Sequence, residues 1–337
     1  MSSVGSAANP FVERLQAHAE ALRKRPRLTL VPPQDATPTA PRPEHRSFWQ
    51  SPAVRAALNN RITGDPSKSP EAYFAERHGA AVPRPLALSL RSSDARLEAA
   101  LIRGAGGCER VVGLEDDEGR AQRADADVPG SLREQLRFQT GSVLQWTPAE
   151  PLGAVIARNA LHRQHELDAV LDRCRRLLAS DGLLFIDEFV GPALFQWTDT
   201  QLEVINRLLG CLPEELLVEI GGSQQHKRAV VRAQPASHAA ANPHDAVCSD
   251  RILAGLDARF ERVEVRLYGG ALYHQLFNRI MGNFAARPEL VRVLMEFDAL
   301  LTDRGVLSSD YVWGVWRRPA GSGPGRRARR WLRARRG

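Results

Sequence analysis

Hydrophobic residues in the middle of the chain gather in short runs that alternate with amphipathic stretches. The runs predict strands at Leu86–Leu90, Val111–Leu114, Arg137–Thr140, Ala154–Ala157 and Leu183–Asp187. The stretches between and after them predict helices at Asp94–Arg103, Glu118–Ala126, Leu167–Leu178 and Asp199–Leu209. Short apolar strands separated by helices are typical of a parallel sheet that is covered on both faces. We therefore expect an α/β domain.

The pattern changes after about residue 220. Residues 232–248 are rich in Ala, Pro, Asn and His and predict a long loop. The elements expected after that loop are a helix at Ser249–Leu256, a strand at Phe260–Tyr268, helices at Ala271–Asn283 and Glu289–Arg304, and a last strand at Tyr311–Arg317. The chain therefore closes its sheet with two further strands.

The N-terminal part has a different composition. Residues 1–46 are rich in proline and predict an unfolded extension with one short helix at Phe11–Arg23. In the next segment, a helix should run from Pro52 to Leu58, residues 59–65 should form a turn, and Tyr73 and Phe74 should lie on a second helix. We expect this helical pair to pack over the edge of the main domain.

These patterns divide the chain into four parts. The parts are a proline-rich extension (1–46), a helical lid or edge segment (47–84), the main α/β domain (85–318) and a flexible basic tail (319–337).

Composition narrows the class of protein. Of the 337 residues, 43% are hydrophobic and 25% are charged, which is usual for a soluble globular protein. No apolar run is long enough to span a bilayer, and the N-terminus has no secretion signal. The four cysteines are far apart and form no zinc-type cluster, so we expect reduced thiols, no metal and a cytoplasmic location.

The net charge of +7 belongs to the tail. Residues Arg326–Gly337 contain seven arginines and no acid, so the rest of the chain is neutral on balance. Such a tail could bind nucleic acid phosphates or an anionic membrane, or it could simply be solvated. Of these we favour weak, salt-sensitive contact with polyanions, because no base-reading fold accompanies the tail.

The stretch from Leu86 to Glu115 has the order strand, polar turn, helix, strand and acid, which is the order of a nucleotide-binding βαβ unit. A helix N-terminus there suits an anion, and an acid after the second strand can accept hydrogen bonds from a ribose diol. The turn carries no glycine. From the pattern alone, a βαβ unit without a ligand remains an equal alternative.

Several longer motifs resemble a known family. Asp187–Trp197 reads DEFVGPALFQW, residues 158–162 read RNALH, and Leu86–Glu98 and Val112–Glu115 are similar to the family's LSLGCGDGRLE and VGVD. Over about residues 48–318 the chain resembles class I S-adenosylmethionine-dependent methyltransferases, and it is closest to bacterial enzymes of the small-molecule or glycan type. The resemblance implies a Rossmann-like, seven-stranded, mostly parallel sheet with helices on both faces and an antiparallel last strand.

The resemblance also implies a site. The residues expected at S-adenosylmethionine are Leu90, Arg91, Ser92, Ser93, Asp94 and Ala95 in the first turn, Glu115 on the ribose, Ser142 beside the adenine, and Arg158 and Asn159 at the sulfur end. The residues expected on the acceptor side are His162 and Glu188 as catalytic groups and Gly191, Phe195 and Trp197 as substrate contacts. His162, Phe195 and Trp197 are equally consistent with a structural role. Asp187 and Glu188 alternate on a strand, so at most one of them faces the crevice.

Two functions follow from these residues. The first is methyl transfer to a small-molecule or glycan acceptor, because the sulfonium cofactor carries the chemistry and the protein only has to align the reactants. The second is an inactive methyltransferase-like module that binds or scaffolds a partner, since Arg91, Ser93 and Ala95 replace the family's glycines. Arg91 could either fill the methionine pocket or pair with the cofactor's carboxylate.

Overall fold

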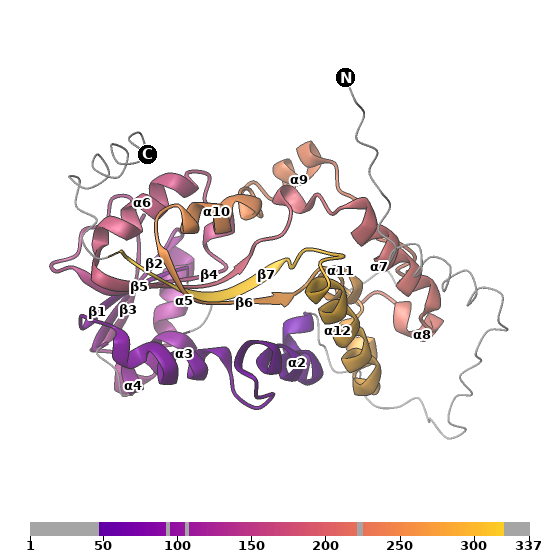
Figure 1. The fold of residues 1–337 in the computed structure, drawn as a ribbon, viewed down its shortest axis with the longest axis horizontal. Coiled ribbons are helices and arrows are strands. Elements are labelled where there is room, and N and C mark those ends of the chain that lie inside the picture. The colour runs from indigo at the N-terminus through magenta and orange to yellow at the C-terminus, as the bar shows by residue number, and fades with distance from the viewer. Residues whose placement is uncertain (1–46, 92–94, 105–107, 221–224, 320–337) are drawn as a thin grey trace, which may run out of the picture. The chain divides into compact units, whose positions relative to one another are not determined.

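The computed structural model describes residues 47–91, 95–104, 108–220 and 225–319, and these residues belong to one compact unit (Figure 1). The predicted helix at Phe11–Arg23, the turn residues Ser92, Ser93 and Asp94, and the basic tail lie outside the described residues. The four-part division of the chain stays a prediction.

A seven-stranded sheet forms the centre of the described unit. Its strands are β1 (Leu86–Leu90), β2 (Arg110–Glu115), β3 (Leu136–Thr140), β4 (Leu152–Arg158), β5 (Leu178–Phe189), β6 (Glu261–Gly269) and β7 (Tyr311–Arg317). They lie in the order β3-β2-β1-β4-β5-β7-β6. The pairs among β1 to β5 are parallel, and β7 is antiparallel to both of its neighbours. The expected Rossmann-like sheet with an antiparallel last strand is confirmed.

The strand order creates a switch point. β1 pairs with β2 on one side and with β4 on the other, so the chain builds the sheet outward from β1 in both directions. In open α/β sheets, ligands bind at the carboxyl ends of the strands beside such a point. Here Leu90, Glu115 and Arg158 end the three strands that meet there.

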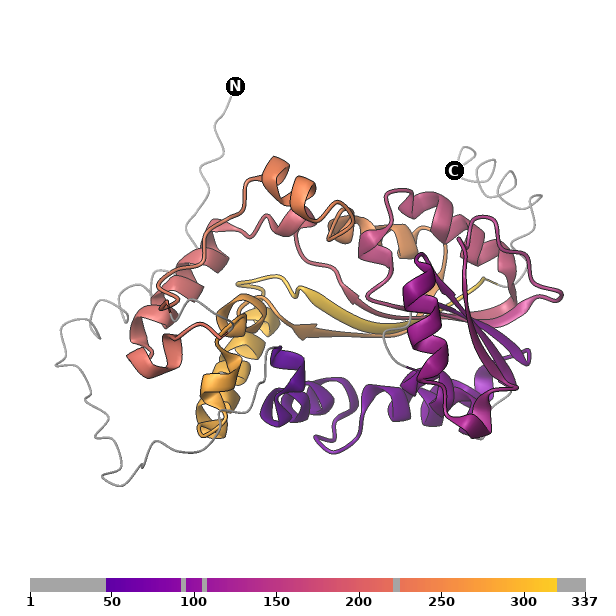
Figure 2. The ribbon, with the colours of Figure 1, turned by 180° about the vertical axis from the view of Figure 1, so that it is seen from behind.

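Helices cover both faces of the sheet, as expected (Figures 1 and 2). One face carries α6 (Leu167–Leu177) and α10 (Ile252–Asp257), and the other carries α2 (Pro52–Thr63), α3 (Pro70–His78) and α4 (Arg96–Arg103). The remaining helices are α5 (Glu118–Ala126), α7 (Asp199–Cys211), α8 (Glu214–Leu217), α9 (Pro235–Ala241), α11 (Tyr273–Phe277) and α12 (Pro288–Asp303). Short 3-10 turns lie at Phe48–Gln50, Gly79–Ala81, Gly130–Leu132, Leu161–Arg163, Ala193–Phe195, Ser249–Arg251 and Met281–Phe284.

Strand alternation divides the core between the two faces. Leu184 and Ile186 of β5 pack in the cluster that includes Leu171 of α6 and Leu256 of α10. Phe185, between them, points the other way and meets Phe74 of α3 at a ring distance of 4.6 Å. The side chain at each strand end therefore has its face fixed by this alternation.

Two expectations about the N-terminal helices have different outcomes. The turn expected at residues 59–65 is wrong for its first five residues, because α2 continues to Thr63 and stops at Gly64, which has φ 83°. Glycine at that position adopts the left-handed conformation without a steric cost, and this ends the helix. The helical pair packs against the sheet edge at β6 and against α12 and α4.

Among the described residues, no helix combines the length and apolar character needed to cross a membrane, and the cytoplasmic location stays a prediction.

Two further expectations are wrong in the second half of the chain. The loop expected at residues 232–248 contains α9, which begins with Pro235 at its first position, where proline is well tolerated. The helix expected at Ala271–Asn283 breaks into α11 and a 3-10 turn. The buried Lys227 amine donates to the carbonyl oxygens of Gln275, Leu276 and Asn278, so these carbonyls do not continue the helix.

Candidate functional site

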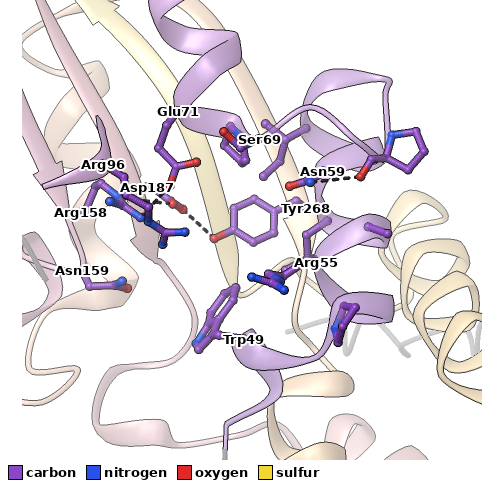
Figure 3. A pocket seen from close by; sticks show the side chains of 16 residues that line it. Trp49, Arg55, Asn59, Ser69, Glu71, Arg96, Arg158, Asn159, Asp187 and Tyr268 are labelled. Carbon is purple, nitrogen blue, oxygen red and sulfur yellow. Dashed lines mark hydrogen bonds and ion pairs between the residues drawn. The ribbon is translucent and has the colours of Figure 1, made fainter. Parts of the chain in front are cut away.

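Three hollows follow one another along the carboxyl ends of β3, β2, β1, β4 and β5. The first is lined by residues that include Leu90 and Ser142, and the second includes Glu115. Arg91 and Arg163 line both the first and the second hollow. Asn159 lines both the second hollow and the third, which is drawn in Figure 3. The switch point of the sheet thus lies beside a series of neighbouring cavities.

Glu115 ends β2 inside the second hollow. Its side chain is 2% exposed, and its Oε1 atom has no hydrogen-bond partner in the described part of the chain. Burial raises the pKa of this carboxyl to about 7, and the nearby Arg91 opposes the rise. An unsatisfied buried carboxylate oxygen is costly, and it marks a position where a ligand hydroxyl would gain a strong acceptor.

Arg91 follows β1 with φ 52°, which is the left-handed conformation that a glycine adopts at low cost. Its backbone N–H donates to the Leu114 carbonyl at 3.0 Å, so the β1–β2 pairing continues through this residue. Its side chain forms an ion pair with Asp116, and burial lowers the pKa of the guanidinium. The turn therefore keeps a glycine-type backbone while its side chain lies along the hollow.

Arginines and an equal number of acids line the two hollows at β1 and β2. Four arginines line the second one, Arg91, Arg120, Arg123 and Arg163. Arg163 is paired with Asp245 at 3.2 Å. Ser142, which was expected at an adenine, is exposed in the first hollow, and its Oγ accepts the Leu144 N–H at 3.3 Å. Leu90 lines that hollow as well, and Ala95 is a buried residue at the start of α4.

Arg158 and Asn159 leave β4 in different directions. The Arg158 side chain contacts Glu71 of α3 at 3.1 Å and lies 4.0 Å from Asp187 of β5. Asn159 has φ 49° and is exposed, and its N–H donates to the Asp187 carbonyl at 3.0 Å. The end of β4 therefore separates the second hollow from the third.

The third hollow has a volume of about 530 Å³, within the range of small-molecule sites. It lies between the helical segment of residues 47–84 and the ends of β4 and β5 (Figure 3). Its polar walls are formed by Arg55, Asn59, Ser69, Glu71, Arg96, Arg158, Asn159 and Asp187. Its aromatic walls are Trp49 and Tyr268.

Asp187, near the end of β5, lines this pocket. The Tyr268 hydroxyl donates to its Oδ1 at 2.7 Å, and its side chain is 20% exposed. Burial raises the pKa of Asp187 to about 6, while Arg158 and the tyrosine hydroxyl oppose the rise. This carboxylate is ionised near neutral pH and has a proton affinity suited to a general base.

Glu188 points to the opposite face of the sheet and is fully buried. Its Oε1 accepts the backbone N–H groups of Ala160 and Leu161, and its Oε2 lies 2.8 Å from His162 Nδ1. The other ring nitrogen of His162 is 3.4 Å from Asp245. This arrangement ties the segment after β4 to β5, and neither side chain lines the three hollows. Their catalytic role stays a prediction.

Gly191, Phe195 and Trp197 lie beyond β5 in a cluster of aromatic rings. Phe195 stacks on Trp197 with centroids 5.4 Å apart, and both meet His274 edge-on. A side chain at Gly191 would collide with Phe189. These residues form packing contacts and do not line the three hollows, and their contact with a substrate stays a prediction.

Neither a family model nor a curated protein matches this sequence. Solved structures do resemble the chain. They include the [4+2]-cyclase SpnF (12% identity, 74% of this chain and 80% of that chain, TM-score 0.42). An S-adenosylmethionine-dependent methyltransferase from Mesorhizobium loti matches with 14% identity over 74% of this chain and 98% of that one, TM-score 0.41. S-adenosylmethionine-bound CalS10, an amino pentose methyltransferase from Micromonospora echinaspora, matches with 22% identity over 36% and 51%, TM-score 0.29.

The third hollow is lined by residues that no sequence motif indicates. Trp49, Arg55 and Tyr268 come from a 3-10 turn, from α2 and from β6, which are far apart along the chain. No local motif joins them. One usable signal was the adjacent pair of acids at the end of β5, of which alternation sends one to each face.

Proposed function

We propose that the chain is a methyltransferase that takes S-adenosylmethionine in the first two hollows and a small-molecule acceptor in the third. One observation carries the proposal. At the carboxyl end of β2, beside the switch point, Glu115 presents a buried carboxylate oxygen that has no partner among the described residues. A ribose diol at that position would supply the missing hydrogen bond.

The residues present fit an adenosyl ligand with one change from the usual site. Glu115 suits the ribose hydroxyls, and the first hollow beside Ser142 suits a flat base. Arg91 suits the carboxylate of the methionine moiety, because guanidinium binds carboxylate in a bidentate geometry. When bound, the sulfonium supplies an activated methyl group. The chain itself would orient the acceptor, exclude water and accept a proton.

Calorimetric titration of the full chain with S-adenosylhomocysteine tests the proposal. We expect saturable binding at micromolar to millimolar ligand, in the range of ordinary enzyme affinities. No heat and no thermal shift at millimolar ligand would refute it.

The second candidate is a methyltransferase-like binding module that lacks activity. The observation that favours it is the Arg91 guanidinium, which lies along the hollow and is paired with Asp116. Arg91→Gly separates the two functions. If only the glycine variant binds S-adenosylhomocysteine, the arginine blocks the site and the parent is a module. If the parent binds and the variant loses affinity, Arg91 belongs to the binding site.

A further inference from the structure

The geometry points to one class of acceptor for the pocket in Figure 3: a flat ring that carries a hydroxyl or amine at one end and an anionic group at the other. The nucleophile would meet Asp187, and the anion would meet Arg55. This inference rests on the proposed function, and it concerns the acceptor that the same site selects.

The position of the pocket is right for the second substrate. Asn159 lines both this pocket and the hollow that contains Glu115, so a donor held by Glu115 and an acceptor in the pocket would meet beside Asn159. Asp187 and Asn159 are joined through a backbone hydrogen bond of 3.0 Å. Asp187 therefore lines the acceptor pocket on the strand next to β4, whose end carries Asn159.

The shape of the pocket favours a ring. Tyr268 is held by stacking on Tyr311, with centroids 5.5 Å apart and planes 15° from parallel. Trp49 meets the same Tyr311 ring edge-on at 5.3 Å and is 38% exposed. Helix α2 adds apolar surface with Pro52, Ala56, Leu58 and Ile62. Fixed aromatic and apolar walls of this kind bind planar ligands at a low entropic cost.

The charges favour an anion beside Arg55 on the α2 side of the pocket. Arg55 is exposed and has no ion pair with a carboxylate in the described ranges, and Figure 3 shows its guanidinium beside Trp49 and Tyr268. Arg158, by contrast, is already paired with Glu71 at 3.1 Å. We therefore assign the carboxylate contact to Arg55, which Figure 3 shows across the Tyr268 ring from Asp187.

Asp187 would accept the proton of the nucleophile. In the reaction an O–C or N–C bond forms to the methyl carbon, the C–S bond breaks with its electron pair kept by sulfur, and the proton moves to the Asp187 carboxylate. Tyr268 donates to the Oδ1 atom of that carboxylate, and the proton would go to Oδ2, which lies 4.0 Å from Arg158 Nε. A positioned base of this kind contributes about 10²- to 10⁴-fold to a rate.

The anion contact is tested with 4-hydroxybenzoate and its neutral amide, 4-hydroxybenzamide, as probes for calorimetry on the full chain. We expect the acid to bind about tenfold more tightly than the amide, and Arg55→Ala to remove this difference. Arg292→Ala, at an exposed arginine on α12, is the matched control and should change nothing. Equal binding of acid and amide, or an unchanged preference in Arg55→Ala, would overturn the assignment.

The nucleophile contact is tested by comparing 4-hydroxybenzoate with benzoate, which lacks the hydroxyl. We expect benzoate to bind about tenfold more weakly to the parent, and Asp187→Ala to remove the difference. Asp187→Asn keeps the shape of the side chain, so it reports on the pocket if the alanine variant unfolds. In an assay with S-adenosylmethionine and 4-hydroxybenzoate, Asp187→Asn should lower the turnover of 4-hydroxybenzoate at least 100-fold with little change in KM. Unchanged turnover in Asp187→Asn would reject Asp187 as the base. So would an absence of turnover by the parent when it binds both S-adenosylmethionine and 4-hydroxybenzoate.

These measurements separate the two proposals. If the benzoate series behaves as expected but S-adenosylhomocysteine does not bind, the acceptor pocket stands and the methyltransferase proposal fails. If S-adenosylhomocysteine binds but the Arg55 and Asp187 variants leave the preferences unchanged, the acceptor class is wrong and the methyltransferase proposal stands.

Discussion

Glu115→Gln should make the ligand-free protein more stable while weakening its affinity for the proposed methyl donor, S-adenosylmethionine. The carboxyl group is 2% exposed, and burial raises its pKa to about 7 from a usual value of 4.5. Since one pKa unit corresponds to about 1.4 kcal/mol, ionised Glu115 costs the folded state about 3 kcal/mol at pH 8. Glutamine has nearly the same shape and removes the charge.

The sign of this effect depends on pH. An acid whose pKa is raised in the folded state binds its proton more tightly there, so its favourable contribution is complete below pH 4.5 and is lost as pH rises to about 7. We therefore expect the glutamine variant to gain about 1–3 kcal/mol in free energy of unfolding at pH 8, and much less at pH 4. Urea unfolding at both pH values measures the gain. Glu109→Gln, at an exposed acid just before β2, is the control and should stay near zero.

The donor affinity should move in the opposite direction. A hydrogen bond from a ribose hydroxyl to a charged acceptor contributes about 1.5–3 kcal/mol, so the variant should bind S-adenosylhomocysteine about 10- to 100-fold more weakly at pH 8. Parent affinity should also fall as pH drops below 7, while that of the variant should stay flat. A glutamine variant that is less stable at pH 8, or that binds S-adenosylhomocysteine as tightly as the parent, would refute the role of Glu115.

Three further predictions follow from buried or basic groups. Asp298 is 1% exposed and accepts the N–H groups of Gly270 and Leu272 at 3.0 and 2.6 Å, so Asp298→Ala should lower the free energy of unfolding by about 2–5 kcal/mol in urea denaturation. Burial lowers the pKa of His162, but the neighbouring carboxylates of Glu188 and Asp245 outweigh burial and raise this pKa overall. The stability lost in His162→Gln should therefore be full below pH 6.5 and shrink as pH rises above it, measured as urea midpoints across pH. Removing residues 320–337 should abolish retention on heparin at low salt, and unchanged retention would contradict a polyanion-binding tail.

Periodic patterns were enough to predict most of the sheet. The runs at β1 and β7 match their strands residue for residue, because a strand buried on both faces reads as a continuous apolar run. The helix at Glu118–Ala126 was equally clear from its sequence. Local patterns failed where a residue far away in the sequence decides where a helix ends. Lys227 takes the carbonyls that α11 would otherwise use, and nothing in residues 271–283 signals a lysine more than forty positions away.

Local patterns also predicted only part of the candidate site. The acid at the end of β2 was predictable because its spacing after β1 is local. The adjacent acids of β5 were recognised as lying on opposite faces, but the sequence could not say which face holds a pocket. In the structure, Glu188 accepts hydrogen bonds from backbone N–H groups, whereas Asp187 accepts one from Tyr268 and lines a cavity. A carboxylate already bound by two N–H groups and a histidine has little capacity left to take a substrate proton, whereas Asp187 accepts one hydrogen bond from Tyr268 and has Arg158 Nε 4.0 Å from its other oxygen. Glu188 therefore holds the backbone after β4 in place, its catalytic role stays a prediction, and the base that we propose is its neighbour Asp187.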